Sequence, residues 1–156
     1  MSFDDKYYVR LAIEIAQRAR EKGNHPFGAL LVDEHGKILL EAENTVVTLP
    51  DITAHAEINL IRQASARFES AYLEKCSIYT STEPCPMCSG AIFWSNIRRV
   101  VYGLSITGLY DLVGWDADDV LNIPCRKVFA QGHKHINVVG PLLEEEAIIV
   151  HAGFWI

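Results

Sequence analysis

The sequence predicts an α/β protein, a three-layer α/β/α sandwich built around a mixed five-stranded sheet. Three observations carry this prediction: an amphipathic helical pattern comes first, a hairpin pattern follows, and three further short strands alternate with helices. A hairpin gives an antiparallel pair, whereas strands joined by a helical crossover can be parallel, so both kinds of pairing are expected in one sheet. With 156 residues, the chain is expected to form a single domain, residues 1–156, since domains usually have about 100–200 residues.

The first part of the chain supplies a helix and a hairpin. Residues 4–20 are expected to be helical, because apolar side chains recur at helical spacing and charged side chains occupy the other face. Gly23 follows and suits a helix end. Residues 27–32 and 37–42 are expected to be the two strands of a hairpin, since the four residues between them have turn chemistry. Residues 45–51 are expected to form a connecting loop.

The remaining elements alternate between helix and strand. Thr53 is expected to cap a helix that begins near Ala54. Residues 66–75 are expected to form an irregular link, and residues 76–80 a short buried strand. A helix with a proline in its first turn is expected over residues 86–95. The last four expected elements are a strand at 99–103, a helix at 124–131, a strand at 136–139 and a helix at 141–151.

Composition and charge narrow the classes of function. Hydrophobic residues make up 49% of the chain and charged residues 22%, and no apolar run reaches the about 18 residues of a membrane span, so no membrane partner is expected. The N-terminal residues lack the basic start and apolar stretch of a signal peptide, and we therefore expect a cytoplasmic protein. The net charge of −6 favours a small-molecule substrate over a nucleic acid, because phosphate binding usually requires a basic face.

The four cysteines do not suggest a disulfide framework, because nothing in the sequence indicates secretion. Cys85 and Cys88 have the spacing of metal ligands. Cys76 and Cys125 each lie beside apolar residues, so they are expected to be small buried hydrophobic side chains rather than reactive thiols.

Two short stretches carry the chemistry: His55-Ala56-Glu57, and Pro84-Cys85 followed by Cys88. One imidazole and two thiols are three ligands for zinc, which leaves the fourth position of a tetrahedral site open, as in catalytic rather than structural sites. A redox pair or half of a structural zinc knuckle are the alternatives for an isolated Cys-x-x-Cys. The two stretches together, with the proline in place, favour a catalytic site.

Helix N-termini are expected to assist this site. The positive end of a helix beginning near Ala54 favours the carboxylate of Glu57 and disfavours protonation of His55. The N-terminus of the following helix is expected to lower the pKa of the thiols of Cys85 and Cys88, which makes thiolate ligands more accessible.

The two stretches, together with His25-Pro26-Phe27-Gly28-Ala29 and Asn44, resemble the cytidine deaminase-like superfamily of zinc deaminases. The likeness is strongest to bacterial guanine deaminases and tRNA adenosine deaminases, and it covers roughly residues 4–104. It implies one zinc ion per chain, held by His55, Cys85 and Cys88, and a water activated for attack on an amino-bearing ring carbon. Glu57 would then be the catalytic residue that transfers protons during release of ammonia.

The resemblance also implies substrate contacts. Asn44 corresponds to an asparagine that binds the substrate, with a simple turn residue as the alternative. Phe27 corresponds to a wall of the base pocket, with burial in the core as the alternative. The backbone N–H of Ala56 is a third expected contact. His25 is expected to be a loop residue without a role, and Glu83 to lie beside the metal.

Residues 105–119 depart from the tRNA-editing pattern, since aspartates and large aromatic side chains crowd an otherwise apolar stretch. They are expected to form either a lid over the base pocket or a solvated acidic loop. Carboxylate acceptors suit a ring rich in N–H donors, and guanine is therefore the favoured substrate. The alternatives are adenosine-to-inosine deamination of tRNA and, in a different class, a zinc-binding scaffold without activity.

Two apolar segments indicate further contacts. Phe154-Trp155 is expected to pack against the core or a partner subunit, because two large rings seldom remain free in water. Ile92-Phe93-Trp94 lies on the second helix of the expected metal site, and it motivates the prediction of a homodimer.

Overall fold

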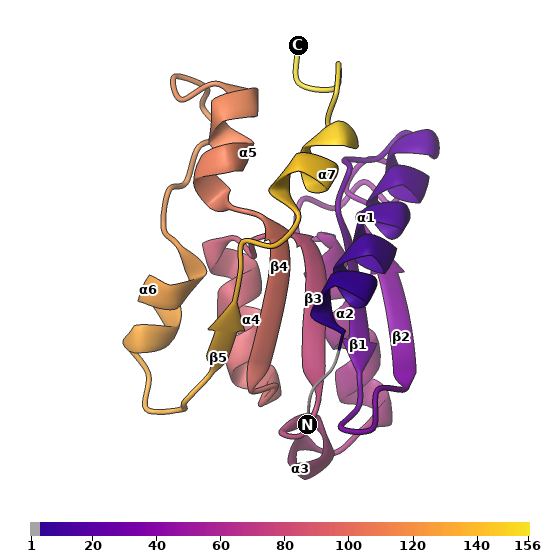
Figure 1. The fold of residues 1–156 in the computed structure, drawn as a ribbon, viewed down its shortest axis with the longest axis vertical. Coiled ribbons are helices and arrows are strands. Elements are labelled where there is room, and N and C mark those ends of the chain that lie inside the picture. The colour runs from indigo at the N-terminus through magenta and orange to yellow at the C-terminus, as the bar shows by residue number, and fades with distance from the viewer. Residues whose placement is uncertain (1–3) are drawn as a thin grey trace.

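A five-stranded sheet with helices on both faces organises the computed structural model, which describes residues 4–156 (Figure 1). The strand order is β2-β1-β3-β4-β5. Strand β1 pairs antiparallel with β2 and β3, whereas β3/β4 and β4/β5 are parallel. The predicted three-layer fold and mixed sheet are thereby confirmed. The strands are β1 Gly28–Val32, β2 Ile38–Glu43, β3 Ser77–Thr82, β4 Arg99–Leu104 and β5 Asn137–Val139.

The helices divide between the two faces of the sheet. α1 and α7 cover one face, and α2, α4 and α6 cover the other (Figure 1). Among the helices of residues 4–156, none combines the length and apolar character that crossing a bilayer requires. The helices are α1 Asp5–Glu21, α2 Ala56–Arg67, α3 Ser70–Leu73, α4 Pro86–Ser95, α5 Ile106–Val113, α6 Cys125–Ala130 and α7 Glu144–Ile149.

Close packing between α1 and β1 fixes the first face. Helix α1 places the small side chains of Ala12 and Ala16 against the sheet, and both are fully buried. A Cβ atom at Gly28 would lie 2.5 Å from the carbonyl oxygen of Ala12 and 2.6 Å from the nitrogen of Ala16, so only glycine allows this approach. The second face is held by a larger apolar cluster, in which Leu60 of α2 and Ile92 of α4 are fully buried.

Two helices begin two or three residues later than the sequence prediction placed them. Helix α2 begins at Ala56 with His55 as its N-cap residue, because Thr53 uses its backbone N–H and hydroxyl to bind Oδ1 of Asp51 at 2.8 and 2.7 Å and does not cap the helix. The last helix begins at Glu144 instead of near residue 141, since Leu143 has a left-handed backbone with φ 57°.

Two helices lie outside the sequence prediction. The link predicted over residues 66–75 contains the short helix α3, and the segment 105–119 contains α5. Ser105 is the N-cap residue of α5, and its Oγ accepts the backbone N–H of Gly108 at 3.1 Å. Leu109 and Val113 repeat at helical spacing in this segment, so an amphipathic pattern is present but is obscured by the surrounding acidic residues.

Candidate active site

Three metal-ligating side chains meet where the N-termini of α2 and α4 face one another. His55 is the N-cap residue of α2, Cys85 is the N-cap residue of α4, and Cys88 lies in the first turn of α4. Nδ1 of His55 lies 3.6 Å from Sγ of Cys85 and 3.5 Å from Sγ of Cys88. Two tetrahedral zinc ligands, one nitrogen and one sulfur, would be separated by about 3.6 Å. This donor set therefore fits a zinc ion with three protein ligands.

The three side chains are strongly coupled electrostatically. The hydrogen bond with Cys88 is the largest cause that lowers the pKa of Cys85, to about 4, whereas the bond with Cys85 and burial raise the pKa of Cys88 well above its usual value. One thiolate is thus already favoured. The contact with Cys85 raises the pKa of His55, so the expected lowering by the helix N-terminus is wrong for the site without metal.

Glu57 is the second residue of α2 and lies beside these ligands. It is only 7% exposed, and its side chain lines the adjoining cavity. Burial is the largest cause that raises its pKa to about 7, with the charge of Cys85 next. A carboxyl group with a pKa near neutrality can take up a proton and give it back, which is the property a general acid–base group needs.

A cavity of about 380 Å³ opens directly onto this group of residues. His55, Glu57 and Cys85 form one side of it, and we call these residues with Cys88 the floor. Leu109, Tyr110, Val113 and Asp119 also line it, together with Trp155 from the chain end, and we call these five residues the roof.

Of the substrate contacts inferred from the resemblance, two face the cavity. Asn44 is 1% exposed; its Oδ1 accepts the backbone N–H of Val46 at 3.1 Å, which leaves the amide N–H groups available to a ligand. Phe27 lines the cavity and also packs against the core, so its two interpretations coexist. Ala56 is fully buried at the start of α2 and does not line the cavity. A contact from its backbone stays a prediction.

The chain end packs over the cavity through aromatic contacts. Nε1–H of Trp155 donates to Nδ1 of His151 at 2.9 Å, and both rings approach Phe27. His25, expected to have no role, lies in the cavity wall with its ring 5.6 Å from that of Trp155. Phe154 contacts His25 and Arg20. The prediction that both terminal aromatics pack on the protein is confirmed.

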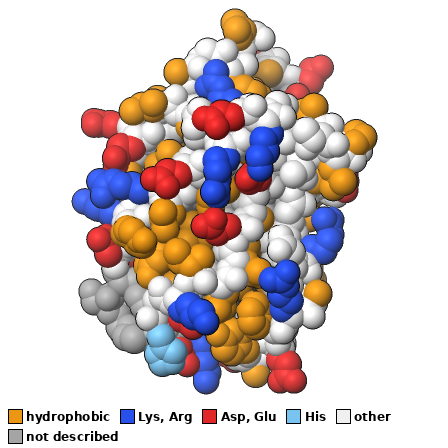
Figure 2. Space-filling view, turned by 90° about the vertical axis from the view of Figure 1, so that its right-hand side faces the viewer, with side chains coloured by type: hydrophobic (Ala, Val, Ile, Leu, Met, Phe, Trp, Pro, Cys, Tyr) orange, Lys and Arg blue, Asp and Glu red, His pale blue; other side chains and the backbone are white. Residues whose placement is uncertain are grey.

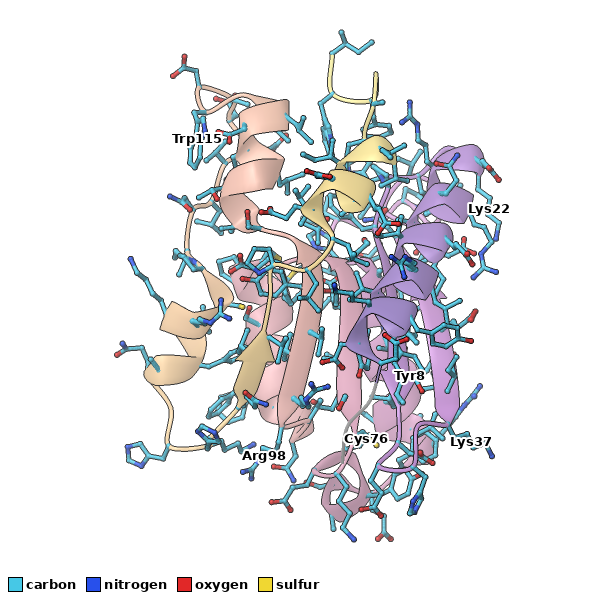
Figure 3. The ribbon with its side chains drawn as sticks, viewed as in Figure 1. Tyr8, Lys22, Lys37, Cys76, Arg98 and Trp115 are labelled. Atoms are coloured by element: carbon cyan, nitrogen blue, oxygen red, sulfur yellow. The ribbon has the colours of Figure 1, made fainter. Side chains whose placement is uncertain are left out.

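The acidic segment 105–119 contributes less charge to the cavity than its sequence suggests. Asp119 alone among its aspartates lines the cavity, and Asp111 instead accepts the indole N–H of Trp115 at 2.7 Å. Trp115 lies beyond the end of α5 (Figure 3). Tyr110 joins α5 to the following loop, because its hydroxyl donates to the carbonyl oxygen of Leu121 at 3.1 Å and accepts the backbone N–H of Leu121 at 3.0 Å.

Comparison with known proteins agrees with this geometry. Residues 2–104 match the family described as the cytidine and deoxycytidylate deaminase zinc-binding region. A probable cytosine deaminase of Schizosaccharomyces pombe is 45% identical over 156 residues, which cover 99% of this chain and 94% of that protein. A guanine deaminase of Bacillus subtilis is 41% identical over 101 residues, or 64% of each chain.

A solved structure gives the same relationship in three dimensions. It comes from a study of adenosine-to-inosine editing by tRNA:A34 deaminases and is 30% identical to this chain. It superposes with a TM-score of 0.72 over 93% of this chain and 99% of its own.

Proposed function

Because this chain belongs to the family of zinc-dependent cytidine and deoxycytidylate deaminases, we propose that it deaminates a free nucleobase by hydrolysis. Family membership makes the chain an enzyme that cleaves a C–N bond with a zinc cofactor, and it removes the inactive scaffold from the alternatives. The residue roles below are part of the proposal. His55, Cys85 and Cys88 hold the zinc ion, and Glu57 is the catalytic residue.

The observation that carries the proposal is the cavity that the floor and the roof line together. Trp155 and Leu109 line it together with the floor residues, and its volume of about 380 Å³ suits a single heterocycle. Within residues 4–156, no lysine or arginine lines it. A phosphate group would therefore find no cation there, which favours a free base over a nucleotide.

Each residue has a distinct physical role in this reaction. Zinc, when bound, supplies a water-derived nucleophile near neutral pH. The buried Glu57 accepts one proton of the attacking water on its carboxylate and gives it to a ring nitrogen; it then accepts the second proton of the same oxygen and gives it to the departing amino group, which leaves as ammonia. Asn44 orients the base with its free amide N–H groups, and the aromatic rings of Phe27 and Trp155 hold it in plane and exclude water.

Cytosine and guanine are the two candidate bases. Cytosine is favoured by the relative from Schizosaccharomyces pombe, whose alignment extends over almost the whole chain and thus includes the roof. Guanine is favoured by the acidic residues of 105–119, of which Asp119 lies in the cavity wall and can accept N–H groups. We place cytosine first, because the alignment to the guanine deaminase covers only 64% of this chain.

tRNA is the principal alternative substrate, since the structural relative comes from work on tRNA:A34 deaminases. The net charge of −6 opposes it. So does the face beside α1, where basic and acidic side chains alternate without a continuous basic area (Figure 2). Ion pairs such as Arg18–Glu41 and Lys22–Glu43 neutralise several of the cations near α1.

The deciding experiment measures ammonia release and base loss with cytosine, guanine and a tRNA anticodon stem-loop, at low and moderate salt. The zinc-loaded protein should turn over a free base with little dependence on salt. Efficient inosine formation in the RNA, falling steeply with salt while both bases remain intact, would replace this proposal with tRNA editing. Protein treated with a chelator is the control.

We also propose a homodimer through the exposed face of α4. Trp94 is 79% exposed and Met87 is 37% exposed on this helix, whereas Ile92 is fully buried and belongs to the core. Sedimentation at micromolar concentration, with Trp94→Ala as the variant, tests the proposal. A monomer for the unmodified chain would refute it.

A further inference from the structure

Glu83 uses both of its carboxylate oxygens to hold helix N-termini. Its Oε1 accepts the backbone N–H of Ile106, the first residue of α5, at 3.0 Å. Its Oε2 accepts the backbone N–H of Cys125, the first residue of α6, at 2.9 Å. Glu83 is only 7% exposed. Hydrogen bonds to a charged acceptor are stronger than neutral ones, and the N-terminus of a helix favours a negative charge.

The two bound residues are the ends of one segment. The first and last residues of the segment 106–125 are both hydrogen-bonded to Glu83, at the start of α5 and at the start of α6. This segment contains every residue of the roof except Trp155. The Tyr110–Leu121 hydrogen bonds also cross-link the segment internally. Glu83 itself comes two residues before Cys85, so one side chain connects both ends of the segment with the floor.

We propose that Glu83 is a positioning residue that fixes the height of the roof above the floor and thereby sets the size of base that the cavity accepts. The effect on the size of the base rests on the proposed function, whereas the anchoring of the segment 106–125 by Glu83 does not. Glu83 lines the same cavity as His55 and Cys85, so a place beside the metal stays a prediction, while its oxygens accept the backbone N–H groups of Ile106 and Cys125.

The carboxylate of Glu144 links the N-terminus of α5 to α7. Oε2 of Glu144, the first residue of α7, accepts the backbone N–H of Ser105 at 3.0 Å and its hydroxyl at 2.8 Å. α7 leads to the chain end that carries Trp155. The N-terminus of α5 is therefore the point where the floor, the segment 106–125 and the chain end are joined.

Glu83→Gln should remove one of the two hydrogen bonds without changing the size of the side chain. An amide has one acceptor oxygen, and its NH₂ group would face a backbone N–H, so one end of the segment loses its anchor. Asp33→Asn is the matched control. Asp33 is also buried, at 8% exposed, and its carboxylate accepts two backbone N–H groups, from His35 at 2.8 Å and Lys37 at 2.9 Å. Asp33 lies in the hairpin turn between β1 and β2. Lys37 of this turn lies at the opposite end of the molecule from Trp115 of the segment 106–125 (Figure 3).

Amide hydrogen exchange of the zinc-loaded protein tests the anchoring without any substrate. In Glu83→Gln, exchange across residues 106–125 should become about 10-fold faster or more, while the strands keep their protection. Asp33→Asn should leave this segment unchanged. Wild-type exchange in Glu83→Gln would overturn the proposal. If that variant does not fold, Glu83→Asp, which withdraws the charged oxygens by one methylene, should show the same faster exchange, and its failure to do so would overturn it as well.

Kinetics then tests the consequence. In Glu83→Gln, KM for the free base should rise about 10-fold with a much smaller change in kcat, and the ratio of kcat/KM for the base over its ribonucleoside should fall, because a loosened roof admits the sugar. An unchanged ratio with faster exchange would refute the role in size selection. If the wild-type protein turns over no base, the proposed function fails, whereas the exchange data still decide whether Glu83 anchors the segment.

Discussion

The floor and the roof of the cavity are built in different ways. The floor comes from two short stretches, each at the N-terminus of a helix, and α2 and α4 pack directly on one another. The roof comes from α5, the loop that follows it and the last residues of the chain. Hydrogen bonds from backbone N–H groups to the distant side chain of Glu83 hold both ends of the segment 106–125, and the chain end carries a local side-chain bond from Trp155 to His151. Local motifs thus provide the chemistry, and long-range contacts select what reaches it.

Removing a floor ligand should have the largest effect. Cys85→Ala, Cys88→Ala or His55→Ala should each lose zinc and activity, because two protein ligands do not hold a catalytic zinc ion. Metal content per chain, measured by mass spectrometry of dialysed protein, checks this. Cys76→Ala is the control: that thiol is buried at the opposite end of the sheet from the roof (Figure 3), and the variant should keep its zinc. A ligand variant with full zinc content would remove that residue from the site.

Glu57→Gln should separate metal binding from turnover within the floor. The variant is expected to retain zinc and its fold and to lose about 10²-fold to 10⁴-fold in kcat, since it can no longer accept a proton. Steady-state kinetics and metal analysis on the same sample give both quantities. Near-normal turnover would exclude Glu57 as the proton-transfer group.

Trp155→Ala should alter the roof and spare the floor. Zinc content should be unchanged, and KM for the base should rise about 10-fold to 100-fold, because stacking of a base on an aromatic ring is worth about 1–3 kcal/mol. Tyr7→Ala, an exposed aromatic of α1, is the control and should leave KM unchanged. If Trp155→Ala loses zinc instead, the roof and the floor are not independent of one another.

The smallest effect concerns how the chain end is held. Burial lowers the pKa of His151 to about 4, below its value near 6.5 in an unfolded chain. The unfolded state therefore binds more protons between pH 6.5 and 4, and stability must fall as pH falls through this window. From pH 7 to pH 5 the loss should be roughly 2 kcal/mol.

Urea unfolding of metal-free protein at these two pH values measures this contribution. His151→Gln should remove it, and the difference between variant and wild type isolates it from other titrating groups. His35→Gln, at a side chain that is 78% exposed, is the control and should keep the wild-type pH dependence. An unchanged pH dependence in His151→Gln would show that His151 is not held neutral beneath Trp155.

Local sequence patterns account for the layers, the mixed sheet and the grouping of His55, Cys85 and Cys88. Hydrophobic periodicity, the hairpin turn and the spacing of a metal motif each act over one element or one turn. Helix and strand boundaries are predicted within a few residues for most elements, including the parallel β4/β5 pair, because these patterns continue throughout the element. The role of Glu57 is the prediction that Glu57→Gln tests, and the substrate contacts of Asn44, Phe27 and Ala56 stay predictions.

Tertiary contacts, in contrast, specify what faces the metal site. His25, Leu109 and Trp155 line the same cavity although they lie far apart in the sequence. The helical pattern of α5 is obscured in the sequence by neighbouring aspartates, most of which do not line the cavity. Thr53 hydrogen-bonds Asp51 instead of capping α2, and the anchoring by Glu83 involves two helix N-termini more than 20 positions away. Such contacts depend on which elements the folded sheet brings together, so no local pattern in the chain specifies them.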